Sequence, residues 1–258
     1  MYPYMQNQAD YYLQQAAKYD LLAMYYKYSD PNRHIYYYKC HLQAMNQALT
    51  CMQTQHGYRA EGAGNPNAKV RILHTSPNAP AVDIYVNGGR VVQNVAFKQV
   101  SRYLDVPGGS HTLEIYPTGQ KNNPVLRESI TLMPGVYYTA AATGPLNELE
   151  LLALVDKPFV EYGQAKVRFV HLSPDVKAVD VATKRGNVLF SGVSFGEAST
   201  YQNVTPGKVD LQVLVTGTSD VALSVPTANI RPNTAYTVYA LGLATGTPAL
   251  EALVLQDS

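Results

Sequence analysis

The sequence twice places a histidine, a serine and an aspartate within ten positions of one another: His74, Ser76 and Asp83, and then His171, Ser173 and Asp180. These are the side chains of a Ser-His-Asp hydrolase, in which imidazole accepts the proton of the serine hydroxyl and a carboxylate orients the imidazole. On a strand, His74 and Ser76 point to the same side, which allows contact. The pattern therefore indicates either two catalytic sites or a structural device that occurs twice.

Several features of the sequence favour the structural interpretation. Ser76 precedes Pro77, which restricts the serine to extended backbone conformations, and neither Ser76 nor Ser173 stands in the Gly-x-Ser-x-Gly turn that exposes a nucleophile. The loop after the serine must cross an end of the domain, where its backbone groups need hydrogen-bond partners. Imidazole, hydroxyl and carboxylate groups can supply them, and such a device is duplicated with its fold. We therefore expect the three side chains of each copy to hold this loop of that copy in place, and we expect no enzymatic activity.

The sequence offers no recognisable site for a metal ion or a cofactor. Its six histidines are scattered without a His-x-His pair, and its two cysteines do not form a Cys-x-x-Cys motif. The acidic residues do not follow the spacing of a calcium loop. A phosphate loop and a dinucleotide fingerprint are also missing. We therefore expect no metal and no cofactor.

Composition argues against two classes of partner. The formal net charge is +1, whereas a nucleic-acid-binding protein needs clustered Lys and Arg. No apolar run approaches the roughly 20 residues that span a bilayer. The N-terminal stretch "MYPYMQNQADYY" has neither the basic nor the apolar region of a secretory signal peptide. We expect synthesis in the cytoplasm, no nucleic-acid partner and no transmembrane segment.

The elements around these residues are also repeated. Both copies open with a Val-Arg pair and continue through His-x-Ser-Pro to Val-Asp. Further equivalent residues are Phe97 and Phe195, Tyr103 and Tyr201, Pro134 and Pro232, and Tyr138 and Tyr236. A period of this length indicates tandem domains rather than a solenoid.

Each copy has the pattern of antiparallel β-structure. "KVDLQVLV", residues 208–215, alternates apolar and polar side chains, which is typical of a half-buried strand. "AVDIYVNGGRVV", residues 81–92, is a strand, an Asn-Gly-Gly turn and a second strand. Short strands separated by frequent turns predict a β-sandwich. We expect mainly β structure, with sandwiches over 69–160 and 161–258.

The residues of the repeats resemble a known bacterial family, domain-of-unknown-function family 4397. The first copy, "VRILHTSPNAPAVDIYVNG", and the more divergent second, "VRFVHLSPDVKAVDVAT", carry the resemblance. It covers roughly residues 68–258. The resemblance implies an Ig-like fold, often in surface or secreted proteins, and it brings no established reaction.

The N-terminal residues 1–60 differ from the repeats and are rich in Tyr and Gln, and a turn-forming linker follows at 61–68. Two apolar stripes at helical spacing, separated by Ser29-Asp30-Pro31, predict a helical hairpin. The two predicted stripes are Leu13, Ala17, Leu21, Met24 and Tyr28, and Tyr38, Leu42, Met45, Leu49 and Met52. We expect these stripes to face each other or a partner.

Two sets of side chains lie opposite the predicted stripes. Tyr12, Tyr19 and Tyr26 recur every seven residues and predict an exposed aromatic row. Cys40 and Cys51 lie eleven residues apart, about 16 Å along one helix, which is too far for a mutual disulfide. We expect these five residues to be assembly contacts, with the cysteines free or bonded to other chains. The alternative is a hairpin that only packs on itself or on a partner.

These patterns leave two hypotheses for function. The first is a non-enzymatic structural or adhesive protein of a surface layer, such as a bacterial spore coat, whose tail mediates self-association or binds other proteins of the layer. The Tyr- and Gln-rich composition of residues 1–60 favours it. The second is a carbohydrate- or peptide-binding β-sandwich module that uses loop tyrosines, such as Tyr116 and Tyr162.

Overall fold

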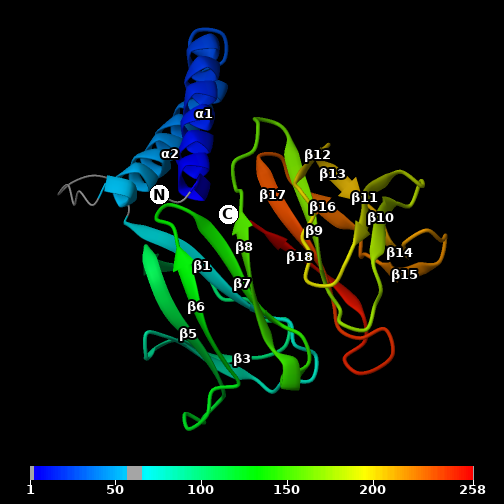
Figure 1. Cartoon of the computed structure of the whole chain (residues 1–258). Helices are drawn as coiled ribbons and strands as arrows, with labels where there is room; N and C mark the ends of the chain where they lie inside the picture. The colour runs from blue at the N-terminus through cyan, green and yellow to red at the C-terminus, as the bar shows by residue number, and fades with distance from the viewer. Residues whose placement is uncertain (1–2, 57–65, 258) are drawn as a thin grey trace. The chain divides into compact units, whose positions relative to one another are not determined.

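The computed structural model describes residues 3–56 and 66–257. A helical hairpin precedes two β repeats, as the sequence predicts (Figure 1). Residues 61–65 of the predicted linker, and residues 1–2 and 57–60 of the predicted tail, lie outside the described residues.

The strands of the two repeats follow one another without an intervening long helix. The first repeat contains β1 (Asn67–His74), β2 (Val82–Val86), β3 (Gly89–Val95), β4 (Leu104–Pro107), β5 (Gly109–Pro117), β6 (Leu126–Leu132), β7 (Tyr137–Thr143) and β8 (Glu150–Asp156), with the short 3₁₀ turn η1 (Leu146–Glu148) before β8. The second contains β9 (Ala165–Leu172), β10 (Val179–Thr183), β11 (Val188–Val193), β12 (Gln202–Val204), β13 (Gly207–Val209), β14 (Leu211–Val215), β15 (Val221–Ser224), β16 (Ala228–Ile230), β17 (Thr234–Leu241) and β18 (Glu251–Gln256).

Each repeat has two four-stranded sheets, and the strand order is the same in both. The orders are β4-β1-β7-β8 and β3-β2-β5-β6 in the first repeat, and β12-β9-β17-β18 and β11-β10-β14-β15 in the second. The second repeat adds a two-stranded sheet of β13 and β16. The shared order confirms that the sequence duplication is a duplication of the fold.

The pairing of β17 with β9 differs from the predicted purely antiparallel arrangement. β17 runs parallel to β9 along their full length, with Thr234 opposite Ala165 and Leu241 opposite Leu172. Parallel neighbours need a long connection between them, and here the segment from β10 to β16 supplies it. Local alternation of side chains cannot reveal such a pairing, because it depends on which distant strands meet.

The core of the second repeat lies between its two four-stranded sheets. Phe169 from β9 packs in one cluster with Val181 from β10 and Val213 from β14, and all three side chains are buried. Alternate residues of β14 enter this core, as the pattern of residues 208–215 predicts.

The helices form an antiparallel hairpin, α1 (Pro3–Tyr26) and α2 (Pro31–His56). Asp30 caps α2, because its carboxylate accepts hydrogen bonds from the N–H groups of Asn32 and Arg33, each at 3.1 Å. Pro31 then occupies the first helical position, where its missing N–H is not needed. The predicted helix break at residues 29–31 is therefore confirmed.

The helices meet along a seam that the sequence analysis placed on the outside. We call it the inner seam; its residues are Ala9, Tyr12, Ala16, Tyr19, Ala23 and Tyr26 on α1, and His34, Tyr37, His41, Ala44, Ala48 and Cys51 on α2. Nδ1 of His34 lies 2.9 Å from the carbonyl oxygen of Ala23, and Nδ1 of His41 lies 3.0 Å from that of Ala16. Tyr37 stacks between Tyr19 and Tyr26.

The predicted exposure of the assembly contacts is therefore wrong for most of them. Tyr12, Tyr19 and Cys51 are buried, while Tyr26 and Cys40 are half-buried. The physical reason is that alanines let two helices approach closely and tyrosine rings fill the space beside them. Most of the Leu and Met stripes remain outside, with Leu21 69% and Met24 62% exposed.

The chain divides into two compact units that do not coincide with the repeats. The first comprises Met1–Val70, Tyr103–His111 and Ile130–Tyr138, and the second comprises Arg71–Arg102, Thr112–Ser129 and Thr139–Ser258. Within the first unit, Gln47 Nε2 donates to the carbonyl of Gly135 at 2.6 Å, and Cys51 Sγ lies 3.8 Å from the carbonyl oxygen of Pro134. These contacts join α2 to the turn before β7.

Candidate functional site

In the first repeat, the histidine, serine and aspartate have separate surroundings. His74 Nε2 lies 3.0 Å from the carbonyl oxygen of Pro80, while its Nδ1 and the hydroxyl of Ser76 are buried without a hydrogen-bond partner. The carboxylate of Asp83 accepts a hydrogen bond from the N–H of Asn94 at 2.8 Å. The serine hydroxyl is thus not hydrogen-bonded to the imidazole, although all three side chains are buried.

The second repeat gives its histidine and aspartate equivalent surroundings, whereas its serine hydroxyl, unlike that of Ser76, has a hydrogen-bond partner. His171 Nε2 lies 3.1 Å from the carbonyl oxygen of Lys177, and the hydroxyl of Ser173 donates to the carbonyl of Gly242 at 2.7 Å. Asp180 accepts a hydrogen bond from the N–H of Gly192 at 2.7 Å, and this bond lowers the pKa of its carboxyl. In both repeats the histidine thus faces the carbonyl six residues ahead, and the aspartate binds the following strand.

Burial controls the charge of both histidines. It lowers the pKa of His74 and of His171 below the ordinary value of 6.5, although the carbonyls of Pro80 and Lys177 act in the opposite direction. The imidazoles are therefore neutral in the folded protein at neutral pH. A neutral imidazole with its proton on Nε2 can donate to these carbonyls.

We expect the free energy of unfolding to fall when the pH is lowered from 7.5 to 5.5. Between the folded and unfolded pKa values, the unfolded chain binds more protons at these two histidines than the folded chain does. Their contribution to the free energy of unfolding is therefore fully present above the unfolded pKa of about 6.5. This contribution is lost as the pH falls through the pKa values of the two histidines in the folded protein. Urea unfolding at several pH values measures the effect. A variant carrying both His74→Gln and His171→Gln should lose less stability over the same pH range. If its free energy of unfolding depended on pH as steeply as that of the wild type, the two histidines would not be the cause.

A second constellation, which the sequence analysis missed, lies where the repeats meet inside the second compact unit. Arg71 of β1 donates to Thr139 Oγ1 of its own repeat at 2.8 Å. Its other nitrogens cross to the second repeat, reaching the carbonyl of Gln256 at 2.6 Å and the carboxylate of Asp257 at 2.5 Å. The guanidinium and the carboxylate are both buried.

The second repeat makes the same contacts in the opposite direction. Arg168 of β9 donates to Thr237 Oγ1 of its own repeat at 2.9 Å and to the carbonyl of Val155 at 2.8 Å. It also forms an ion pair with Asp156 at the end of β8, and both side chains are buried. Each repeat therefore contributes one arginine and one aspartate to a reciprocal cluster, in which two cations balance two anions.

Two threonines and a group of apolar side chains complete this junction. Thr139 Oγ1 and Thr237 Oγ1 each donate to the aspartate of their own repeat at 2.6 Å. The neighbouring buried residues come from both repeats: Leu73, Ala141, Leu154, Val170, Leu172, Tyr239 and Leu241. The repeats therefore share a core that combines buried charge with packed hydrocarbon.

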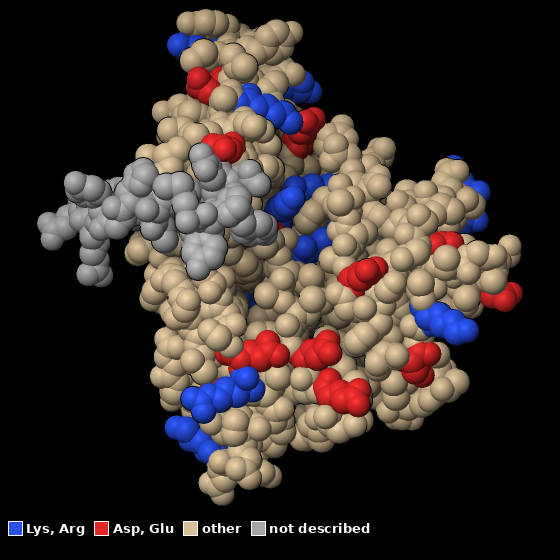
Figure 2. All heavy atoms as spheres, in the orientation of Figure 1, with Lys and Arg blue, Asp and Glu red and all other residues tan. Residues whose placement is uncertain are grey.

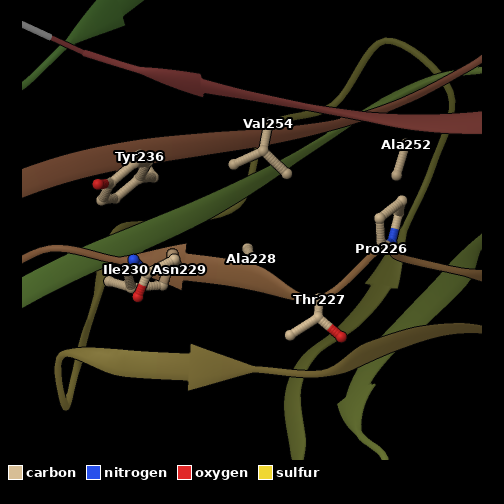
Figure 3. Close-up of a pocket in the computed structure, with 8 residues that line it drawn as sticks. All are labelled: Pro226, Thr227, Ala228, Asn229, Ile230, Tyr236, Ala252 and Val254. Carbon is tan, nitrogen blue, oxygen red and sulfur yellow. The ribbon is translucent and has the colours of Figure 1, made fainter.

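The second repeat also has a groove beside its core. It has a volume of about 320 Å³, and its lining residues are Pro226, Thr227, Ala228, Asn229, Ile230, Tyr236, Ala252 and Val254. Figure 3 shows Tyr236, Val254 and Ala252 on one side and the residues of β16 on the other. The groove is mainly apolar with few polar groups, which is the usual character of a small-ligand site.

The cysteines have surroundings that disfavour reaction at neutral pH. Burial raises the pKa of Cys51 to about 11 and also raises that of Cys40. The thiolate is the reactive form of a cysteine, so both thiols stay protonated. Neither cysteine is in a disulfide, and α2 is continuous between them.

The described part of the chain carries charged side chains of both signs. Lys, Arg, Asp and Glu are interspersed on the face drawn in Figure 2, with no extended basic area there. Among residues 3–56 and 66–257, no three His, Cys, Asp or Glu side chains are grouped so as to hold a metal ion. None of the described helices combines the length and apolarity needed to cross a membrane.

Comparison with known sequences identifies one family. The model of DUF4397, described as a domain of unknown function, matches residues 68–182 and 184–258. No curated protein matches the chain.

Solved structures give weak similarities. A family 26 carbohydrate-binding module from Eubacterium rectale in complex with maltoheptaose is 8% identical, with a TM-score of 0.24 over 74% of this chain and 97% of that one. The Bacillus anthracis TIE protein is 10% identical, with a TM-score of 0.25 over 69% and 34% of the two chains. A candidate cell adhesion protein from Bacteroides ovatus is 9% identical, with a TM-score of 0.21 over 74% and 96%. These TM-scores are too low to support an inference.

Proposed function

Because the chain belongs to the DUF4397 family through both of its repeats, and that family is not defined by a reaction, we propose a function from the geometry. The protein is a non-enzymatic structural or adhesive component of a surface layer, and its helical hairpin mediates assembly. The observation that carries this proposal is the reciprocal Arg–Asp cluster, which joins segments of both repeats within the second compact unit.

The surroundings of the histidines and serines support a structural role for them. Catalysis by a triad needs a serine hydroxyl bonded to imidazole, whereas the hydroxyl of Ser173 donates to the carbonyl of Gly242. We propose that His74, Ser76 and Asp83, with His171 and their equivalents Ser173 and Asp180, hold the loops of the two repeats in place. Purified full-length protein should then hydrolyse no ester or amide in a Ser76-dependent or Ser173-dependent manner.

The exposed face of the hairpin supports a role in assembly. Leu21, Met24 and Tyr28 are between 62% and 90% exposed, which is unusual for large apolar side chains that lie together. A layer built from inside the cell, such as a spore coat, is the finer form of this proposal. It rests on the Tyr- and Gln-rich composition of residues 1–60.

The test is the location of the full-length protein in the source cells, by immunolabelling and by extraction of surface layers. We expect the protein in a layer that resists mild detergent. The double variant Leu21→Gln, Met24→Gln should increase the amount of protein that mild detergent extracts at least tenfold. The matched control is Val188→Gln with Val221→Gln, which alters exposed apolar residues of the second repeat and should leave the protein in place. A protein found only in the soluble fraction would contradict the proposal.

The groove of Figure 3 favours a second candidate, binding of a carbohydrate or a peptide. Tyr236 supplies an aromatic surface, and Asn229 supplies an amide for hydrogen bonds. Glycan and peptide arrays probed with the full-length protein would find such a ligand. Ala228→Leu, which fills the groove, should then abolish binding, whereas Val188→Gln should not.

A further inference from the structure

The second helix carries a second apolar seam, one residue further along the chain than the inner seam. We call it the outer seam; its residues are Ile35, Tyr38, Leu42, Met45, Leu49 and Met52. Four of them are large and between 44% and 51% exposed, while Met45 and Met52 are half-buried. A shallow depression lined partly by Leu42, Met45 and Leu49 runs along it.

The spacing of the outer seam identifies the shape of its partner. Apolar residues three and four positions apart, repeating every seven residues, form a straight stripe that another α-helix can follow. The inner seam of α2 has the same spacing and is covered by α1. The outer seam thus has the pattern of a helix-packing surface, but within the described residues it is left largely exposed.

The order of the spacings is compatible with pairing to a second copy of the same helix. Read from either end, the seam has the spacing three, four, three, four, three. An antiparallel copy of α2 therefore places apolar residues opposite each other along its whole length: Ile35 with Met52, Tyr38 with Leu49, and Leu42 with Met45 of the second copy. Such self-complementarity is required of a twofold interface.

Charge favours the same antiparallel arrangement. α2 contains no acidic residue, and its lysine, Lys39, lies beside the outer seam. A parallel pairing in register would bring the two Lys39 side chains together, and like charges in contact are unfavourable. In the antiparallel pairing each Lys39 lies near Ala48 of the second copy, so the two ammonium groups are well separated.

The first helix widens the same face. Successive residues of a helix are rotated by about 100° around its axis. On α1, the exposed stripe therefore lies about 130° around the axis from the inner seam. On α2, the outer seam lies about 100° around the axis from the inner seam. Because the helices are antiparallel, both rotations lead to the same side of the hairpin. With about 200 Å² for a fully exposed large side chain, this side presents roughly 800 Å², the share of one partner in a standard interface.

From these observations, we propose that the protein forms an antiparallel homodimer through the outer seams of two hairpins. The inference rests on the proposed role of the hairpin in assembly and names the first step of that assembly. Association is measured on purified full-length protein, so its failure would not decide whether the protein belongs to a surface layer, which is tested in cells.

The experiment is sedimentation equilibrium or light scattering of the full-length protein over a range of concentrations. The wild type should be a dimer at micromolar concentration. Leu42→Glu, which brings two carboxylates close to the twofold axis, should weaken association at least tenfold. Val188→Glu adds the same charge at an exposed apolar position of the second repeat, away from the hairpin, and should leave the dimer intact. Circular dichroism should show the same helix content in both variants.

A charge exchange tests the orientation. Tyr38→Glu alone and Leu49→Lys alone should each weaken association, and the double variant should recover at least tenfold, because each glutamate then faces a lysine of the second copy. A wild type that stays monomeric at 200 µM, about two hundred times a dissociation constant of 1 µM, overturns the proposal and leaves the face to another partner. Full association of Leu42→Glu, or no recovery in the double variant, also overturns it.

Discussion

Replacing Arg168 with methionine is expected to lower the free energy of unfolding by about 3–5 kcal/mol. The substitution keeps the hydrocarbon volume but removes the closest guanidinium from the buried carboxylate of Asp156, which then keeps only the more distant Arg71, at 3.7 Å. A buried charge without its partner retains its full desolvation cost, which is much larger than the net value of the pair. Urea unfolding of the full-length protein measures the loss.

The protein contains a matched control for this prediction. Lys98 of the first repeat and Glu251 of the second also form an ion pair, at 2.9 Å, but their side chains are 44% and 37% exposed. Lys98→Met should therefore cost no more than about 1 kcal/mol. Combining Arg168→Met with Asp156→Asn should recover part of the loss, because it removes the unpaired charge. Equal effects of Arg168→Met and Lys98→Met would contradict the importance of burial.

Gly242→Ala should also be strongly destabilising, by about 2–5 kcal/mol. Gly242 has a φ of +91°, and a Cβ at this position would overlap the carbonyl of Ala249. The change would also displace the carbonyl that accepts the hydrogen bond from Ser173. Thermal or urea unfolding of the purified variant tests the prediction.

Gly217 allows the cost of backbone strain to be separated from the cost of steric overlap. Its φ is +77°, but nothing lies within 4 Å of an added Cβ, so Gly217→Ala should cost only the backbone strain of about 1–2 kcal/mol. The difference between the two variants then measures the close approach at Gly242. If both variants lost the same stability, the overlap with Ala249 would have no energetic consequence.

The fold of the repeats could be predicted from the sequence because its signals are local. Alternation in residues 208–215 and the Asn-Gly-Gly turn near residue 88 define strands and a hairpin without knowledge of their neighbours. The parallel partner of β17 could not be predicted in this way, because it depends on contacts between distant segments.

The hairpin was predicted, but its inside and outside were reversed. Both candidate stripes have helical spacing, and hydrophobicity alone favours Leu and Met over Ala, Tyr and His. The structure instead buries Ala16 and Ala44 at the contact, because small residues bring helix backbones close enough for His41 to reach a carbonyl of α1. The heptad spacing of alanines was the signal that could have identified the inner seam.

The reciprocal cluster was also within reach of the sequence. Arg71 and Arg168 occupy the same position of the two copies, directly after the matched valines. Asp156 ends the last strand of the first repeat, and Asp257 directly follows the last strand of the second. A charged residue in an otherwise apolar strand needs a partner when it is buried. What the sequence could not show is that each arginine pairs with the aspartate of the other repeat.

This crossing of partners has a consequence for how the two repeats stay together. Each repeat carries both halves of the cluster, so the tandem corresponds to a dimer of one domain with its subunits joined by a short tether. A tether of this kind holds its ends at an effective concentration on the order of millimolar, whatever the concentration of the protein. The junction therefore stays closed on dilution, and covariation should link Arg71 to Asp257 and Arg168 to Asp156 rather than residues within one repeat.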